Sequence, residues 1–280
     1  MILQFFSSTL RMTTPLGFAA LGGIYSERSG IINIALEGMM LIGAYGYVVG
    51  ASATESAWIG LCVGIGFGIF IAILFAVATI TFHGEHIVTG IAFNLITFGV
   101  TKYIIPSQER IPGLPEIGLP ILGSFSILVY LLPLLMITSH IMLFKTPWGL
   151  RLRAAGESME ALKTLSLSRA KWQYLGLILS GILASIGGCF LISDNHYFTE
   201  RIIGGRGYVA LAAVIFGNWK PFSAVAASLL FGFSIVIGLA NQWGIPIQLI
   251  ESLPYVLTMV VLAGLVGKSR PPAALGRMET

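Results

Sequence analysis

The chain has 280 residues, of which 56% are hydrophobic and only 10% are charged, and its mean hydropathy is +0.88. A soluble domain carries about a quarter of its residues as charged side chains, so this composition excludes a soluble globular protein and indicates a polytopic membrane protein. The formal net charge of +4 does not indicate a nucleic-acid partner, because membrane proteins concentrate Lys and Arg on their cytoplasmic side.

A helix needs about 20 mostly apolar residues to span a bilayer. Runs of this kind predict spans at residues 5–24, 31–50, 57–80, 87–105, 125–144, 172–193, 203–218, 221–241 and 252–267. The run at 203–218 is short and rich in Gly, which indicates a broken or re-entrant helix. We therefore expect an all-α bundle of about 8–10 transmembrane helices that forms a single domain over residues 1–280.

The basic residues predict an orientation with the N-terminus outside and the C-terminus inside. If the loop 145–171 is cytoplasmic, most Lys and Arg residues fall on its side of the membrane. That side then holds Arg28, the basic residues of the loop, Lys220, Lys268, Arg270 and Arg277, and the other holds Arg11, Lys102, Arg110, Arg201 and Arg206. Residues 106–124, which are rich in Pro and Gly, are expected to form an external loop.

Two segments are faintly similar to each other. "GIINIALEGMMLIGA" (30–44) and "GGRGYVALAAVIFGN" (204–218) align without gaps, which pairs Gly30 with Gly204. In the predicted topology the first segment starts inside and the second outside, which is the arrangement of an inverted repeat. Chance similarity between apolar, Gly-rich stretches is the alternative.

Polar residues within the spans are candidates for function. Glu37 lies six residues past Ile31, which corresponds to a depth of about 9 Å in a helix. A charge there costs about 2.5–3.5 kcal/mol, so Glu37 should face protein, water or a cation, with Arg28 or Arg11 as a partner. Helix packing and the lining of a translocation path both remain open for Glu37 and for Asn33, Asn94, Asn218 and Asn241.

The longest polar interval is "GLRLRAAGESMEALK" (149–163), within the loop 145–171. Gly156 is expected to cap the N-terminus of a short helix, with Glu157 in its first turn and Lys163 in its last. Met159 and Leu162 lie three positions apart and form an apolar stripe on one face. The stripe favours docking on a partner over a solvated connector.

The sequence does not indicate an enzyme. "LAGLVGKS" (262–269) resembles a phosphate-binding loop, but Leu262 replaces the first Gly. Cys62 and Cys189 lie within apolar segments, and "HGEH" (83–86) is interpreted as a solvated turn rather than a metal site. We therefore expect neither a catalytic site nor a metal or cofactor in this chain.

Four stretches resemble the permease subunits of ATP-binding-cassette (ABC) importers, in the branch that serves branched-chain amino acids, ribose and nucleosides. They are "TPLGFAALGGIYSERSGIINIALEGMMLIGA" (14–44), "GEHIVTGIAFNLI" (84–96), "TPWGLRLRAAGESMEAL" (146–162) and "GGRGYVALAAVIFGNWKP" (204–221). The motifs "SERSGIINIALEGMM" and "GRGYVALAAVIFGNWKP" are most similar to the nucleoside-type permeases.

This resemblance implies a permease for a small polar solute, most similar to those for nucleosides, in the cytoplasmic (inner) membrane of a prokaryote. It implies three protein partners: a cytoplasmic ATPase that uses the ATP, a second and related permease subunit, and an extracytoplasmic binding protein or lipoprotein. The family's coupling loop corresponds to Arg153, Ala154, Ala155, Gly156, Glu157 and Ala161, and Met159 and Leu162 would complete the docking surface. Leu162 departs from the family, in which a second Ala is common at that position.

Other functions remain open at this point. A simple sugar or a branched-chain amino acid could replace the nucleoside as substrate within the same family. A secondary transporter that uses Glu37 as an ion or proton site is an alternative from another class.

Overall fold

The computed structural model describes residues 2–104, 109–110, 115, 117, 125–158, 162, 164, 166–199, 201–239, 256 and 270–276. The described part is almost entirely helical, as expected. Its helices are α1 (Ile2–Arg28), α2 (Leu36–Thr54), α3 (Ala57–Ala76), the π-helical turn η1 (Val77–Thr81), α4 (His86–Ile104), α5 (Ile127–Lys145), α6 (Pro147–Glu157), α8 (Arg169–Asn195), α9 (Arg206–Phe216) and α10 (Pro221–Leu239). Two short strands, β1 (Glu109–Arg110) and β2 (Tyr197–Phe198), pair in antiparallel orientation.

Five helices of the described part are long and apolar enough to cross a membrane. They are α3 with η1, α4, α5, α8 and α10, which agrees with five of the predicted spans. The predicted span 252–267 lies outside the described residues, apart from Val256, and so does Asn241. The protein is a helical bundle of the membrane-spanning kind.

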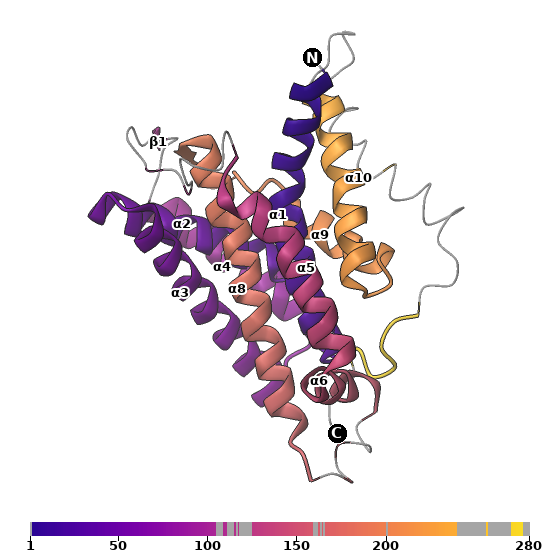
Figure 1. Ribbon diagram of the computed structural model, residues 1–280. Helices are drawn as coiled ribbons and strands as arrows, with labels where there is room; N and C mark the ends of the chain where they lie inside the picture. The colour runs from indigo at the N-terminus through magenta and orange to yellow at the C-terminus, as the bar shows by residue number, and fades with distance from the viewer. Residues whose placement is uncertain are drawn as a thin grey trace.

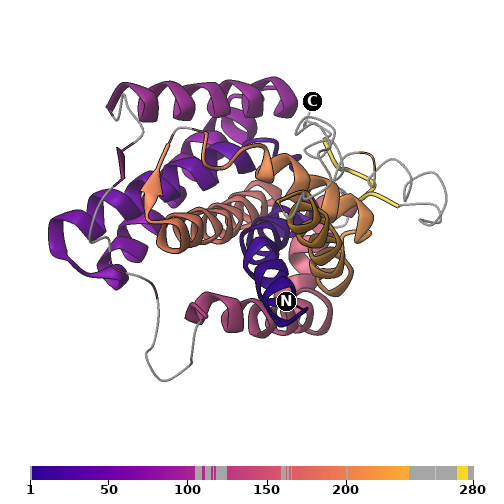
Figure 2. The ribbon, with the colours of Figure 1, turned by 90° about the horizontal axis from the view of Figure 1, so that it is seen from above.

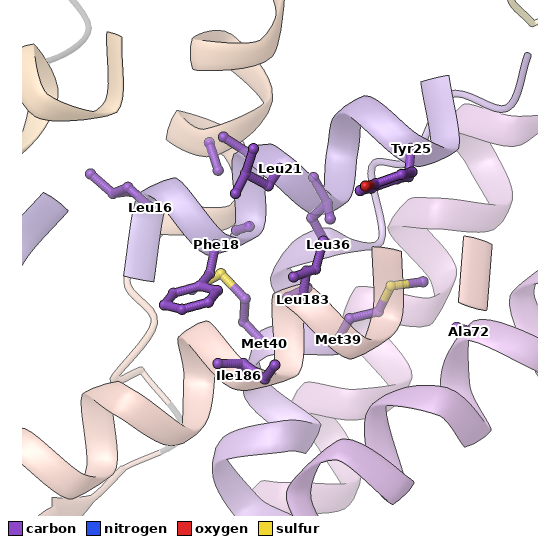
Figure 3. Packing of buried hydrophobic residues seen from close by; sticks show 14 of the residues in the cluster. Leu16, Phe18, Leu21, Tyr25, Leu36, Met39, Met40, Ala72, Leu183 and Ile186 are labelled. Carbon is purple, nitrogen blue, oxygen red and sulfur yellow. The ribbon is translucent and has the colours of Figure 1, made fainter. Parts of the chain in front are cut away.

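The centre of the bundle is formed by α1, α2 and α8. Figure 3 shows Phe18 of α1 beside Met40 of α2, with Leu183 and Ile186 of α8 close by, and all four are buried. Because α1 and α2 are covered by other helices, they do not need the continuous apolar surface that lipid requires. This position explains why α2 tolerates a carboxylate at Glu37.

Small residues allow these helices to approach closely. A Cβ atom at Gly43 of α2 would lie 2.5 Å from the Cα of Ser185 in α8, and one at Gly188 of α8 would lie 3.1 Å from the backbone N of Ala44 in α2. The two helices are therefore in backbone contact, which accounts for part of the high Gly content.

The two ends of the bundle differ. Figure 1 shows the start of α1 and strand β1 at one end, here called the outer end. At the opposite end, here called the inner end, α6 is seen almost along its axis while α1, α5, α8 and α10 run lengthwise, so α6 lies across the bundle. The inner end is the one that the basic residues predict to be cytoplasmic.

The segments α1–α2 and α8–α9 have the same plan in opposite directions. Both α1 and α8 have 27 residues, and each is followed by a non-helical segment and then by a helix that begins inside the bundle. The chain runs toward the inner end in α1 and toward the outer end in α8 (Figure 1). The long helix of each segment packs against helices that follow the other one. Helix α1 contacts α9 and α10, whereas α8 contacts α2 and α3. Figure 2 shows the same bundle from above.

The structure corrects the predicted repeat in one respect. Helix α2 begins six positions after Gly30, whereas α9 begins two positions after Gly204. The gapless alignment therefore does not superpose the helix starts, although Gly30 and Gly204 both have positive φ angles, of 100° and 56°.

Candidate functional site: the broken helices and the inner end

The second predicted span, 31–50, is interrupted. Residues 31–35 are not helical, and α2 begins only at Leu36. Gly30 turns the chain with a φ of 100°, and the buried side chain of Asn33 donates a hydrogen bond of 2.9 Å to the hydroxyl of Ser180 in α8. Glu37 is therefore the second residue of a helix that begins within the bundle, and not the seventh residue of a continuous span.

The carboxylate of Glu37 binds the start of α9. The amides of Gly205 and Gly207 donate to its two oxygens, at 2.8 and 2.6 Å. A carboxylate at this place satisfies amides that have no partner within their own helix and complements the positive end of the helix dipole.

The predicted ion-pair partners of Glu37 are wrong. Arg11 pairs with Asp194 at 3.3 Å, and Arg28 pairs with Glu157 at 3.5 Å near the inner end. The backbone of α9 takes the place of a cation, and Arg206 at the start of that helix adds an electrostatic attraction.

Asn94 of α4 binds the start of α2 in the same way. Its side-chain oxygen accepts a hydrogen bond of 2.8 Å from the amide of Gly38. Its side-chain nitrogen donates to the carbonyl of Ile34, at 3.0 Å, and to the hydroxyl oxygen of Tyr208 in α9, at 2.9 Å. The starts of the two broken helices are thus held together by Glu37 and Asn94.

This junction lies near the middle of the membrane. Helix α9 has 11 residues and ends at Phe216, just before the inner-end residues Asn218 and Trp219. At a rise of 1.5 Å per residue, α9 covers roughly 16 Å, which is about half of a hydrocarbon core of about 30 Å. Helix ends at this depth occur where they are buried in protein or line a polar path.

Asn218 does not belong to this junction. It lies at the inner end, with a φ of 52°, and its side-chain oxygen accepts a hydrogen bond of 3.1 Å from the amide of Arg270. The structure therefore brings Asn33, Glu37 and Asn94 to the starts of the broken helices. It places Asn218 beyond the other end of α9, at the inner end of the bundle.

Arg28 connects three segments at the inner end. Its guanidinium donates to the carbonyl oxygen of Trp219, at 3.1 Å, and forms the ion pair with Glu157 of α6. It also lies over the ring of Phe144, 5.4 Å from the ring centre. Beside it, the indole of Trp219 donates a hydrogen bond to the buried carboxylate of Glu27.

Helix α6 differs from the predicted coupling helix. It begins at Pro147, capped by the side chain of Thr146, and ends at Glu157. Gly156 is therefore in its last turn and not at its start, and a Cβ atom there would lie 2.9 Å from the backbone N of Gly30. Gly156 permits this contact between α6 and the α1–α2 connection.

The residues of the predicted coupling loop have different surroundings. Ala155, Gly156 and Leu162 are buried within the chain. The prediction that Leu162 belongs to an outward docking stripe is therefore wrong. Arg153 donates to the carbonyl of Leu143 at 3.0 Å, which ties it to α5. Met159 and Ala161 lie outside the described residues, as does Lys163.

Glu157 lies on an exposed side of α6 together with residues that the sequence reasoning missed, and Ala154 on the same side is half-buried against the core. Leu150 is 60% exposed at the end of the bundle, and Arg151 beside it is exposed as well. Positions 150, 154 and 157 follow the spacing of one helix face. The signal that could have found this face is Thr146–Pro147, an N-cap residue followed by Pro at the first helical position.

Residues 270–276 bind several of these inner-end elements. The amide of Ala274 donates to the carbonyl of Gly156, at 2.8 Å, and that of Gly276 donates to the carbonyl of Gly30, at 3.0 Å. The amide of Ala273 donates to the carboxylate of Glu157, at 3.1 Å. The segment therefore joins α6 to the connection between α1 and α2.

The "HGEH" turn is a helix start. The carboxylate of Glu85 accepts a hydrogen bond of 2.7 Å from the amide of Val88 in α4. This bond and a second one from Ile87 hold the pKa of Glu85 below its ordinary value. Within the described residues, no group of three or more His, Cys, Asp or Glu side chains could hold a metal ion.

Comparison with known proteins identifies the family of this chain. Residues 5–266 match the family described as the permease component of the branched-chain amino acid transport system. The chain belongs to this family. It is also similar to a guanosine ABC transporter permease of Bacillus subtilis, with 36% identity over 96% of this chain and 94% of the relative.

Two further relatives carry related names. A nucleoside ABC transporter permease of Lactococcus lactis is 35% identical over 96% of this chain and 94% of its own length. A putative glucose ABC transporter permease of Haloferax volcanii is 30% identical over 84% of this chain and 77% of its own length. No solved structure matches the chain.

Proposed function

We propose that this chain is a permease subunit of an ABC importer that carries nucleosides across a prokaryotic inner membrane. It forms the translocation path together with a second, related permease subunit. A separate cytoplasmic ATPase supplies the energy, and an extracytoplasmic binding protein or lipoprotein delivers the solute at the outer end.

The similarity to two named nucleoside permeases carries the choice of substrate. Both relatives are matched over almost their whole length, at 35–36% identity. The stretches 30–44 and 204–218, which contain the connections and starts of the two broken helices, belong to the motifs that resemble nucleoside-type permeases. The glucose-type relative, at 30% identity, makes a simple sugar the second candidate.

Helix α6 is the proposed contact with the ATPase. It lies across the inner end of the bundle (Figure 1), and its exposed residues include Leu150, Arg151 and Glu157. An exposed Leu beside charged residues outside the membrane is suited to a protein partner. Because α6 is helical over 11 residues, it transmits a displacement as a rigid element.

The last turn of α6 supplies the route into the membrane. Gly156 touches Gly30, which precedes the start of α2. Glu157 pairs with Arg28, which also binds the carbonyl oxygen of Trp219 behind α9. A movement of α6 therefore reaches the connections of both broken helices, and these helices meet at Glu37.

Glu37 has a structural role in this proposal. Both of its oxygens accept hydrogen bonds from α9, so the carboxylate already has the partners that a coupling ion or proton would otherwise supply. This observation favours the ABC permease over the ion-coupled secondary transporter.

Uptake of labelled solutes tests the proposal. Cells that lack this chain should lose high-affinity uptake of radiolabelled guanosine, and the gene on a plasmid should restore it. Uptake of D-glucose, D-ribose and leucine in the same cells serves as the comparison. Loss of sugar or leucine uptake with unchanged guanosine uptake would show that the substrate is a different one.

Energy coupling is tested in the same cells. Guanosine uptake should fail when the ATPase carries an inactive ATP site, and it should survive a protonophore as long as cellular ATP is maintained. Uptake that follows the ion gradient and ignores the ATPase would favour the secondary transporter.

A further inference from the structure

Tyr208 holds an unusual position for a tyrosine. It is in the first turn of α9, and therefore near the middle of the membrane, yet 42% of its surface is exposed. Tyrosines in membrane proteins concentrate at the water interfaces, where the hydroxyl can meet water. A hydroxyl that faced lipid at this depth would lose that hydrogen bonding at a cost.

The hydroxyl of Tyr208 is held by a hydrogen bond to its oxygen. Asn94 donates a hydrogen bond of 2.9 Å to its oxygen. Asn94 is itself held, because it donates to Ile34 and accepts from the amide of Gly38. Within the described part of the chain, no acceptor receives the hydroxyl proton of Tyr208. The side chain thus offers one hydrogen-bond donor and a partly exposed aromatic ring.

The elements around Tyr208 belong to the junction of the broken helices. Helices α4 and α9 both contact α2, and Asn94 and Tyr208 meet over its first turn. Gly207, the neighbour of Tyr208, donates to Glu37 and so fixes the start of α9. Tyr208 is therefore carried by the part of the molecule that a movement of the inner end would shift.

We propose that Tyr208 contacts the solute in the translocation path and that Asn94 is its positioning residue. The ring of Tyr208 stacks on the flat base of the solute, and its hydroxyl donates a hydrogen bond to a ring nitrogen or carbonyl oxygen of that base. This inference rests on the proposed function, since it takes a nucleoside as the solute.

Thiol labelling tests whether Tyr208 faces water. In a chain with Cys62→Ser and Cys189→Ser, Tyr208→Cys should react with a water-soluble, charged methanethiosulfonate reagent in the assembled importer. Guanosine should slow this reaction at least threefold. Phe70→Cys, at a position of α3 that is 59% exposed, is the matched control for a lipid-facing side chain and should not react.

Uptake of guanosine by the complete importer tests the contact. Tyr208→Leu removes both the ring and the hydroxyl and should lower uptake about fiftyfold, since a lost stacking contact accounts for about tenfold and a lost neutral hydrogen bond for about fivefold. Tyr208→Phe keeps the ring and should lower uptake about fivefold, the order of one neutral hydrogen bond. Tyr103→Leu and Tyr103→Phe, at an 88% exposed position near the end of α4, should leave uptake unchanged.

The outcomes separate the two proposals. If the wild-type importer does not carry guanosine, the proposed function is wrong. If it does carry guanosine but Tyr208→Cys is as unreactive as Phe70→Cys, Tyr208 faces lipid and the inference is overturned. Labelling that guanosine does not slow, together with unchanged uptake in Tyr208→Leu, would overturn it as well.

Discussion

The carboxylate of Glu37 accepts a hydrogen bond of 2.6 Å from the amide of Gly207, which lies 170 positions later in the chain. This bond joins the starts of two helices that run toward opposite ends of the bundle. It makes α2 and α9 one unit at the centre of the bundle, so we expect them to move together when the inner end changes conformation.

Glu37→Gln should weaken this junction without abolishing transport. The amide side chain keeps one acceptor oxygen, but its NH₂ group replaces the other oxygen and faces a backbone donor. We expect a loss of stability of about 1–2 kcal/mol, which is typical of one lost helix cap. Thermal unfolding of the purified importer in detergent would measure it.

The same variant also tests the ion-site alternative. A substantial part of the ATP-driven guanosine uptake should remain in Glu37→Gln, and neither variant nor wild type should depend on a proton or sodium gradient. A gradient-dependent uptake that disappears in Glu37→Gln would contradict the role of Glu37 as a cap.

Gly207→Ala should prevent the close approach of the two helices. A Cβ atom at Gly207 would lie 2.5 Å from the backbone N of Glu37 and 2.6 Å from its Cα, and neither atom can move away without shifting α2. We expect poor assembly with the partner subunits, measured by co-purification. Gly66→Ala in α3 is the control, because no atom lies within 4 Å of the added carbon, and it should assemble normally.

The spans could be predicted from the sequence because bilayer thickness fixes the length of an apolar run. The short run at 203–218 correctly indicated the broken helix α9. The break at 31–35 was missed because "IINIA" is as apolar as a helix interior, and hydropathy does not report hydrogen bonding. Glu37 could not be assigned its partners, because backbone amides leave no pattern in the sequence.

The position of the coupling helix was predicted wrongly for a different reason. Gly is a common residue at helix caps, but Gly156 instead allows contact with Gly30. Local sequence does not show this contact, because the two residues are far apart in the chain. Thr146 and Pro147 were the local signals, and they mark the start of α6. The resemblance identified the loop, whereas only the structure separated its outward residues, such as Glu157, from buried ones such as Leu162.

Arg28→Ala should uncouple ATP hydrolysis from transport. Arg28 binds α6, the connection after α9 and the ring of Phe144, so its loss separates elements that are proposed to move together. We expect normal co-purification of the ATPase but several-fold fewer guanosine molecules carried per ATP, measured in proteoliposomes.

Glu157→Gln is the milder comparison for Arg28→Ala. The Glu157 side chain is partly exposed, and ion pairs of this kind contribute about 0–1 kcal/mol. The amide can still accept the hydrogen bond from Ala273. Its uptake should stay close to wild type, and equal losses in the two variants would show that the ion pair alone carries the coupling.

Leu150→Asp should remove the ATPase from the complex. Leu150 is on the outward side of α6, so a charge there spoils an apolar contact with a partner but does not disturb the bundle. The chain should insert at normal levels and pair with the second permease subunit. ATPase co-purification and guanosine uptake should both fall at least tenfold.

Thr54→Asp, at the exposed outer end of α2, is the matched control for Leu150→Asp and should retain both activities. Normal ATPase binding by Leu150→Asp would show that the partner docks elsewhere at the inner end.

The attachment of residues 270–276 to Gly30 and Gly156 has a consequence for biogenesis. A chain whose synthesis stops before residue 270 leaves both carbonyls without the donors that Gly276 and Ala274 provide. Its inner end would stay unfinished at the place where α6 meets the start of the second span. Premature termination late in translation would therefore produce inserted chains that a quality-control protease can distinguish from finished ones at the inner end.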